Sequence, residues 1–171
     1  MVEITKANTT HSELIVEIGK QTFLESHGHS ASKEDIQDYI SRTYNKAAIL
    51  KEFDNSNVHY HLIYCDGVIA GFSKIELHTT NKNIADINIS KFDRLYILES
   101  FQGKKLGAQL FNFNIELSIK NKQNGIWLAV WTENQKALHF YQKMNFKIAG
   151  AYDFKISETH SNPNHIMYLK Y

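Results

Sequence analysis

The sequence predicts a mixed α/β fold, in which helices flank one central sheet, and three observations carry this prediction. The first third of the 171-residue chain places apolar residues at helical spacing. Two runs rich in β-branched and aromatic residues then surround Asp66-Gly67, which is a strong hairpin signal. The remainder alternates strand-like and helical runs and finishes with two strand-like runs. This order of elements is that of a mixed α/β domain.

Three helices are expected before the hairpin. Thr10 and Glu13 have capping-box spacing and start the first helix, which carries Leu14, Ile15, Ile18 and Phe23. Ser32 is placed to cap the second helix, whose apolar positions are Ile36, Tyr39 and Ile40. A third, short helix carries Ile49, Leu50 and Phe53. Residues 27–30 form a loop between the first two helices.

Strands are expected at residues 60–64 and 68–76, near 84–89, and at 93–98, 126–131, 147–156 and 165–170. Residues 157–164, which include the only proline, Pro163, form the loop between the last two strands. Two further helices are expected between strands. One carries Leu106, Leu110, Phe113 and Leu117, and the other begins at Asn134 and carries Ala137, Phe140, Tyr141 and Met144.

Composition and charge exclude several classes of protein. With 43% hydrophobic and 22% charged residues, the chain can bury a core of its own, and no linker or repeat divides it. We therefore expect a single domain over residues 1–171. The net charge of +1 is too small to indicate a protein that binds nucleic acid. No apolar run is long enough to span a membrane. Residues 1–7 lack the apolar run of a secretory signal, so a cytoplasmic location is expected.

The segment at residues 96–109 has the ingredients of an anion site. A strand ends, a glycine-containing turn follows and a helix begins, so free backbone N–H groups and the positive end of the helix dipole coincide. Gly103 and Gly107 permit close approach of the backbone, and Lys104 and Lys105 add positive charge. By itself the pattern indicates either a phosphate site or an ordinary turn, and it matches neither a Walker motif nor a dinucleotide motif.

Together with its neighbours, this segment resembles a known family. The acetyl-CoA motif of the GNAT acetyltransferases, Gln/Arg-x-x-Gly-x-Gly/Ala after the fourth strand, is similar to Leu95-Tyr96-Ile97 followed by Gln102-Gly103-Lys104-Lys105-Leu106-Gly107-Ala108. The second signature of that family resembles the run Asn134-x-x-Ala137-x-x-Phe140-Tyr141-x-x-Met144-Asn145-Phe146. The order of elements fits over nearly the whole chain. The phrases at 63–71, 93–97 and 126–134 look like those of PaiA-type spermidine/spermine acetyltransferases.

The resemblance implies a GNAT fold: a central, mixed, mostly antiparallel sheet of about seven strands flanked by helices, whose parallel fourth and fifth strands splay apart. It implies acetyl-CoA as cosubstrate and no metal, with pantetheine along the fourth strand and the pyrophosphate over the turn. The cofactor-binding residues that it implies are Leu95, Tyr96, Ile97, Gln102, Gly103, Lys104, Lys105, Leu106, Gly107, Ala108, Asn134 and Tyr141.

The sequence departs from the family pattern at Lys105 and Asn145, where the motifs have glycine. The family's diphosphate cradle uses mainly backbone N–H groups, and lysine still supplies one. Asparagine tolerates the left-handed conformation that is common at helix ends. We therefore expect cofactor binding to survive both changes.

Two residues are candidates for acid–base catalysis. Tyr141 matches the family tyrosine that protonates the departing thiolate, although its place on an apolar stripe also fits core packing. Asp93 matches a position where some members carry a carboxylate base, and it could equally be a strand residue paired with Arg94. Glu76, at the end of the hairpin, is the rival base. Asn134, which matches a CoA contact, also suits the N-cap of its helix.

The acceptor site is expected between the first helices and the loop at 157–164. Acidic residues there could attract a cationic amine or could form a solvated helix face, and with Glu76 the candidates are Glu25, Glu34, Asp35 and Asp38. The histidines show no convergent set of three or four ligands, so no metal site is expected. Cys65, the only cysteine, reads as a small buried hydrophobe on a strand.

The sequence thus predicts an acetyl-CoA-dependent N-acetyltransferase that transfers acetyl directly to a primary amine. The expected acceptor is a polyamine such as spermidine or spermine. Two alternatives stay open. The acceptor could be a peptide or protein amine, or the chain could be a CoA-binding regulatory module without catalysis, an alternative suggested by Lys105 in place of a motif glycine. Aromatic strands and a C-terminal strand edge are compatible with a homodimer.

Overall fold

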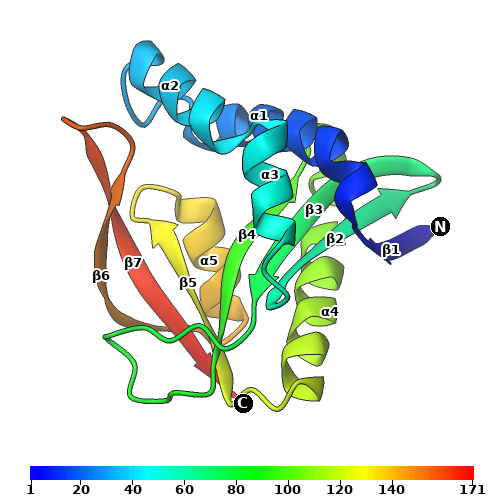
Figure 1. Ribbon diagram of the computed structural model, residues 1–171. Coiled ribbons are helices and arrows are strands. Elements are labelled where there is room, and N and C mark those ends of the chain that lie inside the picture. Colours follow the sequence, from blue (N-terminus) through cyan, green and yellow to red (C-terminus); the bar gives the residue numbers. More distant parts are fainter.

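The computed structural model describes residues 1–171 as one seven-stranded sheet covered by helices (Figure 1). In chain order the elements are β1 (Val2–Lys6), α1 (Ser12–His27), α2 (Lys33–Thr43), α3 (Lys46–Phe53), β2 (Val58–Cys65), β3 (Val68–Glu76), β4 (Ser90–Ile97), α4 (Leu106–Lys120), β5 (Gly125–Trp131), α5 (Gln135–Lys143), β6 (Lys147–Lys155) and β7 (Ser161–Lys170). None of the helices is both long and apolar enough to cross a bilayer.

The strands follow the order β1-β2-β3-β4-β5-β7-β6, and all neighbours are antiparallel except β4 and β5. These two parallel strands pair at only two positions, Ser90 with Ile126 and Lys91 with Trp127, and then separate. The mixed sheet with splayed fourth and fifth strands, which the family resemblance implies, is confirmed.

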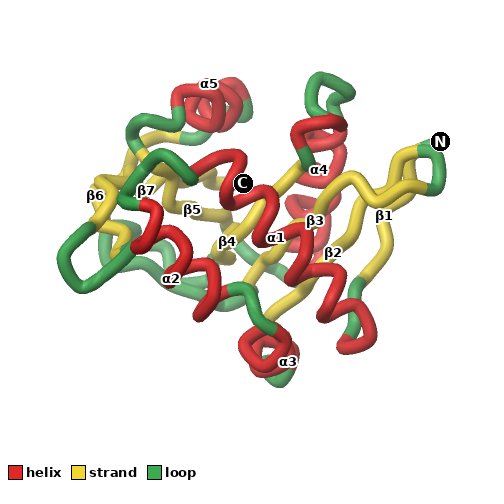
Figure 2. The backbone as a smooth tube through the Cα atoms, turned by 90° about the horizontal axis from the view of Figure 1, so that it is seen from above, coloured by secondary structure: helices red, strands yellow, loops and turns green.

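The helices cover both faces of the sheet (Figure 2). On one face, Ile15 and Ile18 of α1 and Ile49 of α3 pack against side chains of β2 and β3. On the other face, Leu110 of α4 packs against Ile63 of β2, and α5 packs beside α4 in a cluster that reaches β4 and β5. Each face of the sheet therefore has an apolar core of its own.

The three expected helices and the hairpin are confirmed, but the start of the first helix differs. Asn8 and His11 form the capping box, and they cap a one-turn 3-10 helix at Thr9–His11 rather than α1 itself. Thr10 donates to the Asn8 side chain, and Glu13 pairs instead with Lys46 at 2.6 Å. The prediction that Thr10 and Glu13 form a capping box is therefore wrong, because Asn8 occupies the cap first.

Three strand predictions are corrected. The charged start of the chain, for which the sequence predicts no strand, forms β1 at the edge of the sheet against β2. No strand lies at 84–89, because β3 pairs directly with β4 and leaves the connecting segment without a partner. β7 begins at Ser161 rather than at 165, so Pro163 lies within a strand, where its carbonyl accepts a hydrogen bond from the Thr132 N–H.

The buried face of α4 contains a polar network that the apolar stripe does not predict. Of the four expected apolar residues, Leu106 and Leu110 are buried, but Phe113 and Leu117 are only half-buried. Asn114 is fully buried in their place, and its Nδ2 donates to Ser73 Oγ at 2.8 Å and to the Leu110 carbonyl at 2.7 Å. Its Oδ1 lies 3.1 Å from Nδ1 of His61. This network holds α4 in one register against β2 and β3.

His61 makes the stability of the fold depend on pH. Burial lowers the pKa of His61 from 6.5 to about 4, although the Asn114 bond raises it slightly. The unfolded chain therefore binds a proton between pH 6.5 and 4 that the folded chain does not, so stability falls as pH decreases through this range. From pH 7 to 5 we expect His61 to account for a loss of up to about 2 kcal/mol.

His61→Gln, which keeps an N–H donor for Asn114 but does not titrate, should show a shallower loss. The measurement is the free energy of unfolding by urea at pH 7, 6 and 5. Equal slopes for the two proteins would contradict this assignment.

Candidate functional site

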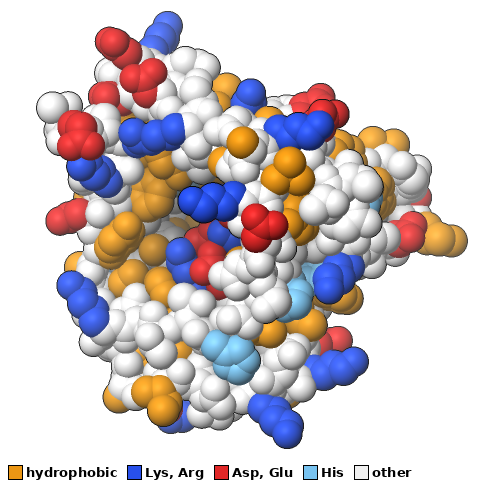
Figure 3. Space-filling view, viewed as in Figure 1, with side chains coloured by type: hydrophobic (Ala, Val, Ile, Leu, Met, Phe, Trp, Pro, Cys, Tyr) orange, Lys and Arg blue, Asp and Glu red, His pale blue; other side chains and the backbone are white.

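Two adjoining cavities occupy the opening between β4 and β5. The first, of about 810 Å³, lies over the start of α4 and is called the α4 groove; its lining includes residues 95–97, most of 102–108 and part of α5. The second, of about 330 Å³, is called the β7 cavity and is lined mainly by residues 91–96, 127–131 and the side chains of β6 and β7 that face them. Figure 3 shows a hollow with hydrophobic walls and both acidic and basic side chains at its floor.

The α4 groove is lined by every residue expected to bind the cofactor except Lys104, whose ammonium lies 5.0 Å from the centre of the Phe101 ring. The first turn of α4 contains no acidic residue, and its leading N–H groups have no partner inside the helix. From Phe92 onward, the edge of β4 that faces β5 is also unpaired. An anion site at a helix start therefore adjoins a row of free backbone groups.

Both residues that replace motif glycines have left-handed backbones. Lys105 has φ of 59° and lies at the N-cap of α4, and Asn145 has φ of 65° just after α5. The expectation that Asn145 adopts this conformation is confirmed. A lysine in the same region costs about 1–2 kcal/mol, because its Cβ approaches the following carbonyl oxygen. Lys105 thus keeps the turn in the geometry of a glycine at an energetic cost.

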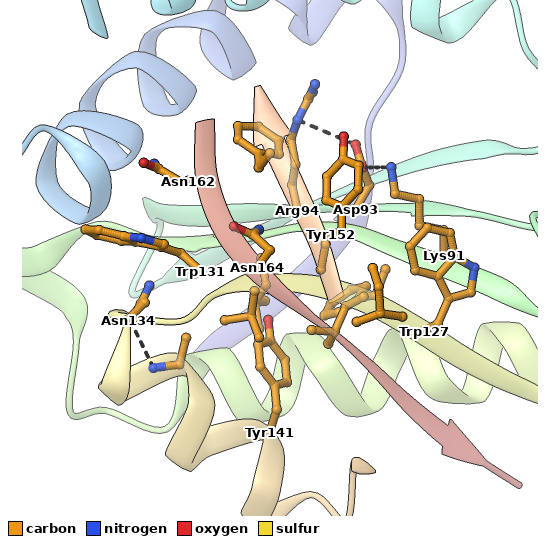
Figure 4. A pocket seen from close by; sticks show the side chains of 18 of the residues that line it. Lys91, Asp93, Arg94, Trp127, Trp131, Asn134, Tyr141, Tyr152, Asn162 and Asn164 are labelled. Atoms are coloured by element: carbon orange, nitrogen blue, oxygen red, sulfur yellow. Dashed lines mark hydrogen bonds and ion pairs between the residues drawn. The ribbon is translucent and has the colours of Figure 1, made fainter. Parts of the chain in front are cut away.

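Asp93 lies at a β-bulge in β4. Lys74 pairs with Arg94 and Ile75 pairs with Phe92, so Asp93 is the extra residue. Because a bulge breaks the alternation of side chains, Asp93 lies beside Arg94, and both line the β7 cavity (Figure 4).

The Asp93 carboxylate forms ion pairs with three neighbouring cations. It lies 3.0 Å from Lys74 Nζ, contacts Lys91, and approaches Arg94 Nε at 3.8 Å. Burial by itself would raise the pKa of Asp93, but the three cations together hold it well below its usual value of 3.8. A carboxyl group with so low a pKa is a weak base near neutral pH. Of the two alternatives that the sequence leaves open, pairing with Arg94 fits this buried setting, and the ion pairs disfavour a role for Asp93 as general base.

Four of the other five acidic candidates lie away from the cavities. Neither cavity is lined by Glu76, Glu34, Asp35 or Asp38. Glu76 instead pairs with Lys74 at 2.7 Å. Asp35 accepts a hydrogen bond from Ser32 Oγ at 2.8 Å, at the start of α2. Of the two alternatives that the sequence leaves open for these residues, the solvated helix face fits those on α2. Glu25 does line the α4 groove, where it accepts the Glu99 N–H at 3.1 Å.

The β7 cavity has aromatic walls and two asparagines. Its aromatic lining residues are Phe23, Phe92, Tyr96, Trp127, Trp131, Tyr141, Tyr152 and Phe154. Asn162 is fully used within the chain, because its Nδ2 donates to Ser30 Oγ at 2.8 Å and its Oδ1 lies 3.0 Å from His160 Nε2. Asn164 Oδ1 is buried and has no hydrogen-bond partner. Leaving such a carbonyl unpaired costs about 1–3 kcal/mol. Sequence patterns give no signal for these asparagines, which fall in the expected loop.

The two cavities share their inner wall. Six residues line both: His27, Leu95, Tyr96, Asn134, Ala137 and Tyr141. The Tyr141 side chain points from α5 into this junction (Figure 4), and burial raises the pKa of its hydroxyl above the usual 10. The hydroxyl is therefore protonated at neutral pH and available as a proton donor. Asn134 Oδ1 accepts the Ala137 N–H at 3.1 Å, so its role as an N-cap is confirmed.

His27 is a residue of this junction that sequence analysis misses, since it reads there as part of a loop. It ends α1, stacks on Phe23 with ring centres 4.9 Å apart, and lies with its Nδ1 2.7 Å from Ser26 Oγ. Burial, with a smaller effect from His29, lowers the pKa of His27 to about 4, so the ring is neutral at pH 7. Only the packing of α1 over the splayed strands brings it here.

No group of three or more His, Cys, Asp or Glu side chains is arranged so that it could hold a metal ion. Cys65 is half-buried rather than buried, and its thiol lies 3.7 Å from an Asp66 carboxylate oxygen. The chemistry of the cavities therefore rests on backbone N–H groups, the Tyr141 hydroxyl and the neutral polar groups around it.

Comparison with known proteins places the chain among acetyltransferases. The family model of the acetyltransferase (GNAT) domain matches residues 56–148, which is more than half of the chain. An uncharacterised N-acetyltransferase of Lactobacillus delbrueckii is 28% identical over 140 residues, covering 82% of this chain and 81% of that protein. The spermidine N(1)-acetyltransferase of Thermoplasma acidophilum is 25% identical over 154 residues, covering 86% and 89%.

Among solved structures, the PaiA N-acetyltransferase of Thermoplasma acidophilum in complex with coenzyme A superposes with a TM-score of 0.80. It is 23% identical, and the superposition covers 100% of this chain and 99% of that one. At this identity the likeness shows the fold, and it extends from β1 to β7.

The backbone of Lys105 leads to a test. Lys105→Gly should raise the free energy of unfolding by about 1 kcal/mol, because glycine adopts a positive φ without strain. If backbone N–H groups hold the phosphates, the affinity for coenzyme A should change by no more than a few-fold. The measurements are urea unfolding and calorimetric titration with coenzyme A.

Lys105→Ala is the matched control, because it removes the same charge but keeps the strained backbone. A tenfold loss of coenzyme A affinity in both variants would instead make the Lys105 ammonium a phosphate ligand.

Proposed function

Since the chain belongs to the GNAT acetyltransferase family, we propose which of its groups carry each step of acetyl transfer. Members of this family move the acetyl group of acetyl-CoA from sulfur to an amine nitrogen, and the chain is an N-acetyltransferase of this kind. The single observation that carries the assignment of steps is that the α4 groove and the β7 cavity meet at Tyr141.

The α4 groove is the site for acetyl-CoA in this proposal. The free N–H groups from Gly103 to Ala108 suit the pyrophosphate, because they lie at the positive end of α4 with no acidic residue among them. The unpaired edge of β4 at residues 95–97 suits pantetheine, whose amides can pair with backbone groups as an added strand would. The thioester then lies near the junction with the β7 cavity.

The β7 cavity holds the acceptor in this proposal. A neutral amine attacks the thioester carbonyl carbon, the C–N bond forms and the C–S bond breaks. A backbone N–H of β4 stabilises the oxyanion, and Tyr141 donates its proton to the leaving thiolate. The raised pKa of Tyr141 keeps its hydroxyl protonated until that step. Because Asp93 is a weak base, we assign removal of the amine proton to water in the cavity.

We propose a polyamine, spermidine or spermine, as the acceptor. Support comes from the relative named as a spermidine N(1)-acetyltransferase and from the aromatic walls, since rings attract ammonium groups and alkyl chains alike. One observation favours the second candidate, a peptide amine: the cavity lining has Lys91 and Arg94 against the single carboxylate of Asp93. A polycation gains little from such a balance of charges.

Tyr141→Phe tests the proton donor. It removes the hydroxyl and keeps the ring, which packs against Phe140 and Phe146, so stability should change little. We expect kcat to fall about 100-fold or more, in the range of general acid catalysis, with the KM for acetyl-CoA within about twofold. Tyr64→Phe, on β2 and outside both cavities, is the control and should retain activity. Unchanged turnover in the Tyr141 variant would leave its ring with a packing role only.

A panel of amines tests the acceptor. Thiol release from acetyl-CoA is measured with spermidine, spermine, an aminoglycoside and a tripeptide with a free N-terminus, beside a reaction without acceptor. We expect release that depends on spermidine and spermine, with the highest kcat/KM in the panel. Release with the tripeptide alone would reject the polyamine and favour the peptide amine. Tight binding of coenzyme A with no transfer to any acceptor would favour a regulatory module.

A further inference from the structure

Asn162 and Asn164 lie two residues apart on β7 and both line the β7 cavity, yet only one is used by the fold. The Asn162 amide is held by Ser30 and His160. Asn164 is only 8% exposed, and its side-chain oxygen has no hydrogen-bond partner in the chain. Buried amide oxygens nearly always have a hydrogen-bond partner. The exception at Asn164 lies in the lining of a ligand-sized cavity.

The sheet register places an aromatic ring on each side of Asn164. Trp131 of β5 and Tyr152 of β6 are its direct cross-strand partners, so the three side chains form one row across the sheet. All three line the β7 cavity, and in Figure 4 the Asn164 amide lies over the same space into which Tyr141 points. A polar oxygen between two rings, beside the proton donor, is the arrangement of a binding group.

We propose that Asn164 is a specificity-determining contact for the acceptor: its side-chain oxygen accepts a hydrogen bond from the N–H of the amine that reacts, with Trp131 and Tyr152 flanking the bound group. This rests on the proposed function, in which the β7 cavity holds the acceptor. A half-turn of the amide about its last bond exchanges Oδ1 and Nδ2 and turns the oxygen toward the bound amine.

The chemistry of the reaction explains why an amide suits this position. The amine arrives mainly as an ammonium and must be neutral when it attacks the thioester. A carboxylate would hold the ammonium and oppose loss of its proton, since a nearby negative charge favours the cationic form. An amide oxygen accepts an N–H bond from the amine in both states. It therefore orients the nitrogen without trapping the wrong form.

Several other hydrogen-bonding groups of the lining are already occupied within the chain. Asp93, the only carboxylate in the lining, is already paired with Lys74 and Lys91. Asn162 is occupied, and the Trp127 ring nitrogen donates to the Thr79 carbonyl at 2.7 Å. Among the hydrogen-bond acceptors of the lining side chains, the Asn164 oxygen is buried and has no partner in the chain.

The first test is Asn164→Leu, which is similar in shape and removes no bond within the chain. We expect its melting temperature to stay within a few degrees of the wild type or to rise, because an unpaired carbonyl is lost. The KM for the acceptor should rise about tenfold or more, with the KM for acetyl-CoA within about twofold. The matched control, Asn162→Leu, loses the bonds to Ser30 and His160 and should melt at a lower temperature.

The second test is Asn164→Asp, which reports on the chemistry rather than on packing. It should lower the KM for the amine and shift the rising limb of the kcat–pH profile to higher pH, because the carboxylate holds the ammonium form. An unshifted profile would overturn the contact with the reacting nitrogen.

Spermidine is the acceptor for these measurements, and the tripeptide replaces it if only the peptide is acetylated. In that case the polyamine fails as acceptor, while the Asn164 comparison proceeds unchanged. If neither is acetylated, spermidine binding to the protein loaded with coenzyme A is measured by calorimetry. Loss of binding in Asn164→Leu supports the contact, and absence of binding by the wild type overturns it. Unchanged kinetics, or melting as low as that of Asn162→Leu, would also overturn it.

Discussion

The site depends on one constraint in the sheet: β4 and β5 run side by side for only two residue pairs and then part. Beyond Lys91 and Trp127, each strand has an edge whose N–H and C=O groups lack the partner that a continued ladder would supply. Those groups need other partners, and a ligand with amides of its own is suited to provide them. Both cavities therefore exist because β4 and β5 stop pairing at this point.

A buried cluster of charges holds the bulge beside this opening. The Lys74 side chain, only 6% exposed, lies within 3.0 Å of carboxylates of Glu52, Glu76 and Asp93. Arg94 binds Glu52 as well, which ties α3 to β4. Removing one partner of a buried pair costs about 3–5 kcal/mol. The Asp93 carboxylate is therefore part of the framework that shapes the cavity.

Prediction from the sequence works best where the determinants are contiguous. Residues 95–108 hold a strand end, a turn and a helix start, so one stretch of chain supplies much of the lining of the α4 groove, including every expected residue of that stretch except Lys104. The acceptor side is different. Asn164 comes from β7, Tyr152 from β6 and His27 from α1, and no local pattern marks them, because each owes its role to a neighbour distant in sequence.

By itself, the sequence determined the five α-helices, most of the strands and the hairpin at Asp66-Gly67, because propensity, turn chemistry and periodicity act over short spans. Only the tertiary structure decided which carboxylates are free. From the sequence, Asp93 could be a base or an ion-pair partner; in the structure it is held as an anion by Lys91 of its own strand and by Lys74, which the pairing of β3 with β4 brings to it. Burial and charge pairing are properties of packing, and a single sequence does not display them.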